Sequence, residues 1–355
     1  VNKQWENLSI DAILGGSIYT YHYNSLQSNT KNGLSVPGFY SIAASVETPE
    51  VSTGTSRKQV NSLFGTLTVG YKDTYYLDVT GRNDWSSTLP KENRSFFYPS
   101  VSASAILDKL FCLEIPQYVN MLKLRASWAN VGRDTSPYAI SYNYNTTDFP
   151  GGYRLGATLP DYLLRPENVA TWEVGLEAKF FQNRLTLDVA AFLSDVTDQI
   201  YDRPVDYITG AKYYTSNIGL IRSKGIEMAV SAVPVRTKDF TWTVSVNASK
   251  SVAHLLNMYG GWDNSQPHQT DMGTTIGSRL YIYNYVGKPM GQLWGKGLTK
   301  APAGSYILNA DGSKVDCSGQ TVLDAETGLP SMSDELRYLG NVNPDWIGGI
   351  SMSFK

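Results

Sequence analysis

The sequence contains few residues of the kind that bind transition metals: two cysteines and three histidines among 355 residues. His22, His254 and His268 show no ligand spacing with one another or with the cysteines. We therefore expect no zinc site and no cofactor.

Long apolar runs and catalytic motifs are also lacking. No run of about 18 apolar residues occurs, which excludes a transmembrane helix but not the weakly hydrophobic strands of a membrane barrel. A nucleophile elbow, a zinc-protease motif and a phosphate loop are absent too, so catalysis has no support. The formal net charge of −2 gives no indication of a nucleic-acid partner, which requires a clustered basic face.

What the chain does contain is a period of two, repeated in segment after segment. Between Leu63 and Tyr71 the odd positions are mostly large and apolar, and the even ones are mostly small or polar. Successive side chains of a strand point to opposite faces, so this pattern predicts strands with one apolar face. We expect one set to point away from a barrel axis, namely Leu67, Val69, Leu77, Val79, Leu176, Leu187 and Val244, and a second set to point toward it, namely Thr68, Asp78, Glu177, Asp188 and Ser245.

The segments with this pattern predict ten strands. They are Leu8–Ile18, Val60–Tyr71, Thr74–Asp84, Phe96–Leu107, Met121–Gly132, Val169–Phe181, Arg184–Thr197, Lys224–Val233, Phe240–Ser251 and Trp346–Phe354, and one or two more are expected within Leu280–Trp294.

The connections between these strands alternate between short and long. The short ones include Lys72-Asp73, Gln182-Asn183 and Pro234–Asp239, and the long ones include Tyr19–Lys58, Thr135–Asn168 and Ser251–Arg337. Short periplasmic turns and long extracellular loops are typical of outer-membrane barrels, whereas soluble sandwiches usually have short loops at both ends. The predicted fold class is therefore all-β, an antiparallel transmembrane β-barrel portion, with a soluble or surface all-β binding module as the alternative.

The two cysteines fall in connections at opposite ends of these strands. Cys112 lies in a connection on the short-turn side, and Cys317 lies deep in the longest excursion. A disulfide requires Cα atoms within ~7 Å, so we expect Cys112 and Cys317 not to be bonded.

Several stretches, in order, resemble the TonB-dependent SusC/RagA-type outer-membrane transporters of Bacteroidetes. They are Ser62–Leu67, Gly70–Leu77, Gly81–Ser87, Phe97–Ser102, Leu164–Asn168, Thr171–Glu177, Asn217–Glu227 and Gly340–Trp346. No single stretch is as specific as a metal-ligand motif, but their succession covers nearly the whole chain.

The resemblance implies a function and partners. It implies active import of oligosaccharides or peptides across the cell outer membrane, with a SusD-like surface lipoprotein as a lid and TonB as the source of force. It also implies that residues 1–355 are part of a barrel of about 22 strands, and that the plug domain, the TonB-contacting segment and the last strands lie outside this sequence. An outer-membrane barrel enzyme is a second alternative, for which His22 near the outer rim is the only histidine to consider.

One cluster is a candidate for substrate binding. Arg82, Asn83, Asp84 and Trp85 combine an aromatic ring with amide and charged groups at a predicted strand end, which suits carbohydrate binding. The alternative is a strand-end ion pair beside an interfacial tryptophan. Trp262, in the longest predicted loop, is a further candidate.

The segment Asn309–Asp316 resembles half of a calcium loop. Its oxygen ligands and glycine fit such a loop, but Glu326 falls too late to complete it. The Asp311-Gly312 pair is also a hairpin signal, and a hairpin is the preferred interpretation.

Overall fold

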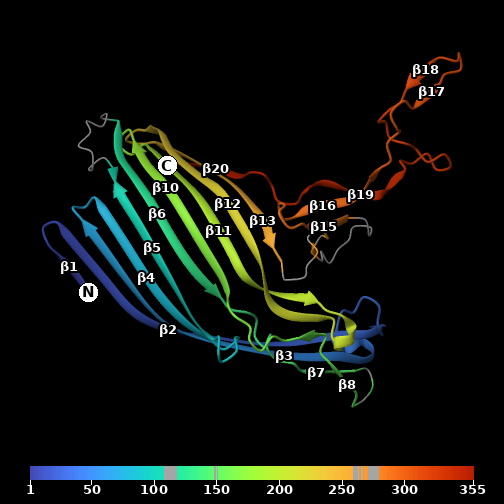
Figure 1. Cartoon of the computed structure of the whole chain (residues 1–355), viewed down its shortest axis with the longest axis horizontal. Coiled ribbons are helices and arrows are strands. Elements are labelled where there is room, and N and C mark those ends of the chain that lie inside the picture. The colour runs from blue at the N-terminus through green and yellow to red at the C-terminus, as the bar shows by residue number, and fades with distance from the viewer. Residues whose placement is uncertain are drawn as a thin grey trace.

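The structure is a computed structural model, and it describes residues 1–107, 118–147, 149, 151–258, 263, 265–266, 268–270 and 280–355. Its main element is one large sheet in the order β1-β2-β3-β4-β5-β6-β10-β11-β12-β13-β20, with β9 paired to β12. Neighbours along this path are antiparallel, as the barrel interpretation predicts, and the strands lie side by side in Figure 1.

The strands of this sheet are long. Their bounds are β1 Asn2–Gln4, β2 Leu8–Leu34, β3 Ser45–Tyr71, β4 Tyr75–Ser86, β5 Ser95–Ile106, β6 Val119–Arg133, β9 Thr158–Leu159, β10 Glu167–Phe180, β11 Leu185–Pro204, β12 Tyr213–Arg236, β13 Thr241–Asn257 and β20 Ile347–Phe354. We call β2–β6, β10–β13 and β20 the wall.

Smaller sheets come from the long connections. The segment after β6 forms β7 (Tyr144–Thr146) and β8 (Tyr153–Leu155). Residues 258–346, which we call the excursion, form β14 His268–Thr270, β15 Leu280–Asn284, β16 Gln292–Leu298, β17 Tyr306–Leu308, β18 Lys314–Asp316 and β19 Met332–Asn341. Two short 3-10 turns are η1 (Ile42–Ala44) and η2 (Tyr207–Thr209). Within the described residues no helix is both long and apolar enough to cross a membrane.

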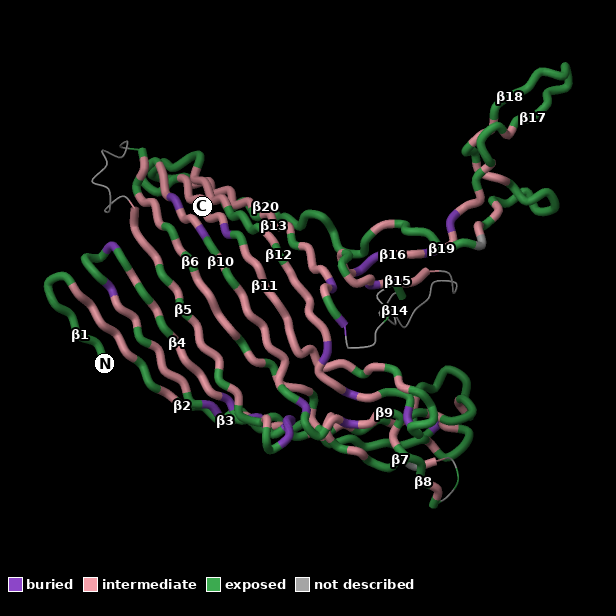
Figure 2. The backbone as a smooth tube through the Cα atoms, viewed as in Figure 1, coloured by how far each residue is buried: buried purple, intermediate pink, exposed green. Residues whose placement is uncertain are grey.

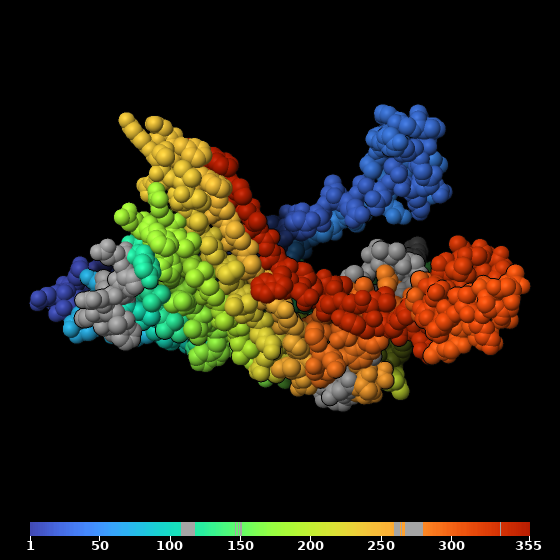
Figure 3. Space-filling view, turned by 90° about the horizontal axis from the view of Figure 1, so that it is seen from above, coloured from blue at the N-terminus to red at the C-terminus, as the bar shows by residue number. Residues whose placement is uncertain are grey.

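The two ends of the wall differ as predicted. The β3–β4, β10–β11 and β12–β13 turns lie together at one end, the short-turn end, where Lys72, Asp73, Gln182 and Asn183 have positive φ angles. The excursion and the far end of the β2–β3 hairpin both project beyond the other end, the long-loop end (Figures 1 and 3).

The prediction of a long loop at Tyr19–Lys58 is wrong. It is mostly a continuation of the β2–β3 hairpin, with paired residues from Ile18↔Asn61 out to Asn29↔Glu50. Most of its side chains are exposed on both faces, as the green tube of Figure 2 shows. With no face to bury, this part of the hairpin needs no apolar alternation, so the signal used to find strands is missing there. β11 and β12 also run beyond their predicted ends at Thr197 and Lys224, but their extensions are mostly half-buried, and Thr215 and Ile218 are buried there.

The two predicted faces of the wall are confirmed. Cross-strand pairs join apolar residues to apolar ones, such as Leu67 with Val79 and Leu176 with Leu124. On the opposite face Thr68 pairs with Asp78, and Glu177 pairs with Asp188. Leu187 and Val244 share the apolar face, and Ser245 shares the polar one.

Aromatic pairs mark both ends of the apolar face. At the short-turn end Tyr71 stacks on Tyr75 with ring centroids 6.5 Å apart, and Trp242 stacks on Phe354 at 6.1 Å. Toward the long-loop end, Trp128 meets Trp172 at 6.0 Å and Trp172 is 60% exposed. Two such aromatic girdles around an apolar band are the pattern of a barrel wall that faces lipid.

Few apolar side chains are fully buried. A small cluster of Ile218, Leu255 and Met258 lies where β12 and β13 meet the excursion. A single sheet buries neither face by itself, so the wall depends on its ladders of backbone hydrogen bonds and on whatever covers its apolar face.

Candidate functional site

The polar face of β3, β4 and β5 carries a row of hydrogen-bonded side chains. The Asp78 carboxylate accepts hydrogen bonds from Thr68 Oγ1 at 2.6 Å and from Ser102 Oγ at 3.2 Å. Thr80 donates to Thr66 across the same pair of strands at 3.4 Å. The predicted inward residues therefore form a hydrophilic surface, as a water-filled lumen requires.

On the same face of β6, β10 and β11, charged side chains link the strands. Arg125 donates to both carboxylate oxygens of Asp188, at 2.9 and 3.1 Å, and its Nε lies 3.5 Å from Glu173 Oε1. Gly175 makes room for this guanidinium, because a Cβ at this position would lie 2.5 Å from Arg125 Cζ. Side chains on three strands are thus tied together at one point of the lumen wall.

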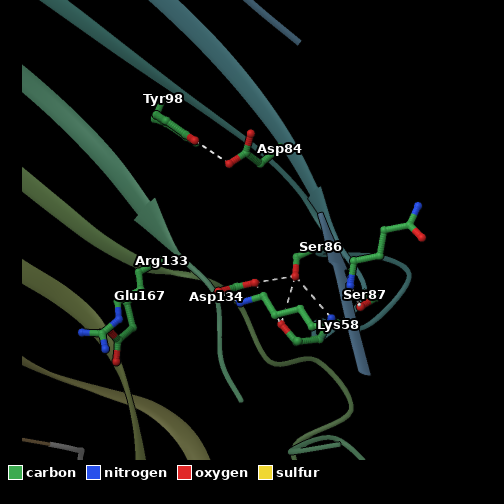
Figure 4. Close-up of polar contacts among 10 residues, drawn as sticks. Lys58, Asp84, Ser86, Ser87, Tyr98, Arg133, Asp134 and Glu167 are labelled. Atoms are coloured by element: carbon green, nitrogen blue, oxygen red, sulfur yellow. Dashed lines mark hydrogen bonds and ion pairs between the residues drawn. The ribbon is translucent and has the colours of Figure 1, made fainter. Parts of the chain in front are cut away.

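The candidate cluster Arg82–Trp85 is divided between the two faces of β4. Arg82 and Asp84 lie on the polar face, where Arg82 Nε donates to Asp84 Oδ1 at 2.8 Å. Asp84 also accepts from Tyr98 Oη at 2.5 Å, which Figure 4 shows. Asn83 and Trp85 face the other way, with Asn83 Nδ2 donating to Ser95 Oγ at 3.0 Å and Trp85 38% exposed. The strand therefore presents an ion pair to the lumen and an aromatic ring to the outside.

A carboxylate that the sequence analysis missed lies at the long-loop end of the polar face. Asp134 follows β6 directly and binds Lys58 Nζ at 2.6 Å, Ser86 Oγ at 2.5 Å and Thr88 Oγ1 at 3.3 Å (Figure 4). Ser86 and Thr88 are each 1% exposed. Asp134 thus joins β3, the β4–β5 loop and the start of the β6–β10 connection.

The β6–β10 connection folds back against neighbouring strands. Tyr138 Oη accepts from the Arg57 backbone N–H at 3.2 Å. At the other end of the connection, Asn217 accepts from Arg165 N and donates to Arg165 O, both at 2.8 Å. Between these anchors β9 pairs with the start of β12. Burial raises the pKa of the nearby Tyr214 phenol, and the negative charge of Asp161 adds to this.

An open hollow of about 540 Å³ lies beside these contacts at the long-loop end. Its lining includes Ser136, Tyr138, Tyr201, Asp202 and Thr215, and Asp202 accepts from Thr215 Oγ1 at 2.5 Å. The volume lies within the range of small-molecule sites, and hydroxyls, a carboxylate and two phenol rings suit a polar, hydrogen-bonding ligand. Nothing in the local sequence marks these residues, because four separate segments contribute them.

The excursion carries an aromatic cluster of its own. Tyr281 stacks on Tyr283 at 5.5 Å, and Trp294 meets Tyr285 at 5.6 Å and Tyr338 at 6.2 Å. Burial raises the pKa of Tyr283, and the two neighbouring tyrosines raise it further. The rings pack on one another and stiffen a sheet that has little other core.

The other predicted sites have simple outcomes. Asn309–Asp316 forms the β17–β18 hairpin, where Asp311 accepts from Ser313 N at 2.9 Å, so the hairpin interpretation is confirmed. Among the described residues no group of three His, Cys, Asp or Glu side chains could hold a metal ion. His22 lies on the β2 extension, 3.4 Å from Arg57 Nε.

The predicted site at Trp262 lies outside the described residues, as does Cys112, one of the two cysteines predicted not to be bonded; Cys317 is a free thiol.

The match to a protein-family model decides the family. The model for the TonB dependent receptor-like β-barrel matches residues 2–337. The chain belongs to this family.

Relatives and solved structures of this family agree with the predicted SusC/RagA type. A TonB-dependent receptor of Formosa agariphila is 26% identical over 86% of the chain, and the TonB-dependent receptor SusC of Bacteroides thetaiotaomicron is 25% identical over 72%. The chain spans only 31% of the first protein and 26% of the second. Among solved structures, the RagAB peptide importer in its closed-closed state matches with a TM-score of 0.71 at 19% identity, over 99% of this chain and 38% of that one.

The resemblance to SusC/RagA-type TonB-dependent transporters and the barrel fold are therefore confirmed, and the chain is part of an outer-membrane β-barrel. Outer-membrane barrels have short periplasmic turns and long extracellular loops, which makes the short-turn end periplasmic and the long-loop end extracellular. The family is one of receptors and transporters, not of enzymes.

Proposed function

We propose that the chain forms part of the wall and extracellular rim of an importer for oligosaccharides or peptides. The observation that carries the proposal is the family match over residues 2–337, together with relatives that include SusC and a solved peptide importer. The polar inner face supports it, because Asp78, Arg125 and Asp188 give the lumen a surface that polar substrates can cross.

We propose further that residues 1–355 are a middle portion of a larger barrel, with a plug domain and further strands outside this sequence. In the part of the chain that the structure describes, the sheet is open, with β1 and β20 at its edges. Unpaired backbone groups in hydrocarbon cost several kcal/mol each, so a lipid-facing sheet must close on itself. Closure by further strands supplies the missing partners.

The proposed partners are a SusD-like lipoprotein above the rim and TonB below the plug. We define the rim as the far end of the β2–β3 hairpin, the β11–β12 loop and the excursion, which all project at the extracellular end (Figure 1). Together they give the lipoprotein a large contact area. Aromatic side chains exposed there include Tyr40, 91% exposed, and Tyr207, 74% exposed. Exposed apolar surface of this kind is typical of a surface that a partner covers.

For substrate contacts we propose two groups of residues. Arg82 and Asp84 line the lumen, and Tyr138, Tyr201 and Asp202 line the hollow above it. Asn83, Trp85 and Trp262 stay as candidates from the sequence.

The test uses the full-length protein in cells that lack their own copy of the transporter. Uptake of a labelled oligosaccharide pool and of a labelled peptide pool is measured for the unchanged protein and for Asp202→Asn. The amide keeps the size of the carboxylate and removes its charge, so we expect uptake of one pool to fall about tenfold, the equivalent of one charged hydrogen bond. Asp311→Asn, on the distant β17–β18 hairpin, is the matched control. Failure of the unchanged protein to import either pool would contradict the proposal.

A further inference from the structure

The outer face of β12 and β13 carries positive charges at the extracellular edge of its apolar band. The ladder pairs place Trp128, Trp172, Leu193, Lys224 and Val252 in one row across five strands. On the periplasmic side of this row Ile226 pairs with Lys250. Both lysines lie on the face that carries Trp172 and Ile226, the face that meets lipid.

The tryptophans fix the height of these lysines in the membrane. Trp172 and Phe180 both face lipid on β10, and Phe180 pairs with Leu185 at the start of β11. Eight residues separate Trp172 from Phe180, about 26 Å along a strand at ~3.3 Å per residue. A strand tilted by about 40° rises ~20 Å over this length, which is most of the apolar band of about 25 Å whose edges are marked by aromatic girdles. Lys224 pairs with Val252, which lies ten residues beyond the periplasmic Trp242 on β13, about 33 Å of strand at ~3.3 Å per residue and ~25 Å of height at a tilt of about 40°. Lys224 therefore lies at the level of the outer-leaflet headgroups.

No acidic side chain among the described residues neutralises Lys224 or Lys250. Arg222, the next outward-facing residue of β12, is neutralised by Asp195, with two hydrogen bonds of 2.7 Å. Lys224 is exposed, and Lys250 lies 5.7 Å from the centre of the Trp346 ring. Neither lysine forms an ion pair with an acid among the described residues. Two positive charges are left at the membrane surface.

The other side of the wall has no such charges at the same height. On β3, β4 and β5 the outward residues at the extracellular edge are Asn61, Asn83, Trp85 and Ser95, all uncharged. A barrel that only needed solubility at this edge could use amides and hydroxyls throughout, as it does there. The lysines on β12 and β13 are therefore a local feature that calls for an anionic partner.

We propose that Lys224 and Lys250 bind the phosphate group of an anionic lipid in the outer leaflet. Diagonal neighbours on adjacent strands are ~7–8 Å apart, so two flexible ammonium groups can reach one phosphate. The surface on the periplasmic side of them is apolar, with Ile226 42%, Met228 40% and Ile350 71% exposed, and receives the acyl chains. The site therefore combines two cations above with an apolar surface below, which matches a phosphorylated lipid.

The test uses the full-length protein with Lys224→Gln and Lys250→Gln combined. The matched control is Lys238→Gln, an exposed lysine of the periplasmic β12–β13 turn on the same two strands. Each protein is reconstituted with bisphosphorylated lipid A or with its dephosphorylated form, and retained lipid is counted by native mass spectrometry. Free inorganic phosphate in a further sample separates lipid binding from anion binding.

We expect the unchanged protein and Lys238→Gln to retain the bisphosphorylated lipid, and the double variant to retain at least tenfold less. The dephosphorylated form should be retained poorly by all three proteins. Equal retention by the double variant, equal retention of both lipids, or displacement of the lipid by inorganic phosphate at matched concentration would overturn the proposal. A folding failure of the double variant is recognised by its heat-modified gel mobility, and the single variants then decide the outcome, with each expected to weaken retention. The outcome is independent of import, because no substrate enters the measurement.

Discussion

The wall and the excursion are both made of β-strands but are held together differently. In the wall, long antiparallel ladders order the backbone, and side chains divide into an apolar and a polar face. In the excursion, strands such as β17 and β18 have three residues each, and carboxylates fix the turns by accepting hydrogen bonds from nearby backbone N–H groups. The comparison shows that exposure has a different meaning in each region: an exposed valine of the wall meets lipid, and one in the excursion meets water.

The largest expected difference between the wall and the excursion is in how far an introduced arginine lowers the free energy of unfolding. Val79 lies on the lipid face of β4 between Leu67 and Val101, and Val315 lies exposed on β18. Val79→Arg should lower the free energy of unfolding by about 2–4 kcal/mol, because arginine near the bilayer midplane is poorly solvated. Val315→Arg should change it by less than about 0.5 kcal/mol. Urea titration of the full-length protein in lipid vesicles measures both, and equal effects would mean that β4 does not face lipid.

A smaller effect is expected at the junction of the wall and the rim. Asp134→Ala removes the partner of Lys58 and the acceptor that the buried Ser86 and Thr88 hydroxyls share, which leaves each of these hydroxyls only the other as acceptor. This ion pair is mostly buried but keeps some contact with water. Its loss should lower the free energy of local opening at this junction by about 2 kcal/mol. Hydrogen exchange of residues 87–94 should then become faster, with Asp134→Asn intermediate. Asp311→Ala, which disturbs only a distant turn, should leave the exchange of residues 87–94 unchanged; if it does not, the wall and the excursion are coupled.

The smallest effect is a pH dependence of the β17–β18 hairpin in the excursion. Hydrogen bonds from Ser313 lower the pKa of Asp311, and hydrogen bonds from Ser318 lower that of Asp316. A carboxyl whose pKa is lower in the folded state stabilises it above the ordinary pKa of 3.8 and loses this contribution as the pH falls through the lowered value. The β17–β18 turn should therefore loosen in this acidic range while the wall ladders stay intact. Carboxyl resonances followed by NMR during acid titration measure this, and titration at the ordinary pKa would contradict it.

The contrast also explains which predictions from the sequence succeeded. The period of two located the membrane portion of each wall strand, because lipid on one side and water on the other impose opposite demands on alternate residues. It missed the outer halves of β2 and β3, where both faces meet water. It also missed most of the excursion, apart from the strands expected within Leu280–Trp294 and the hairpin at Asn309–Asp316.

The candidate site shows the same limit. The sequence singled out Arg82–Trp85 as one cluster because its residues are adjacent, but adjacent residues of a strand point to opposite faces, and the fold separates the ion pair from the tryptophan. Asp134 and Asp202 carried no local signal, since their partners are 76 and 13 residues away along the chain.

The sequence by itself therefore determined the fold class, the two faces of the wall and the direction of the turns, because each follows from local alternation and loop length. Only the tertiary structure decided which polar groups come together: Asp134 with Lys58, the lining of the hollow, and the diagonal positions of Lys224 and Lys250 on adjacent strands. These meetings depend on strand register, and register is fixed by pairing along the whole length of the strands and not by any one segment.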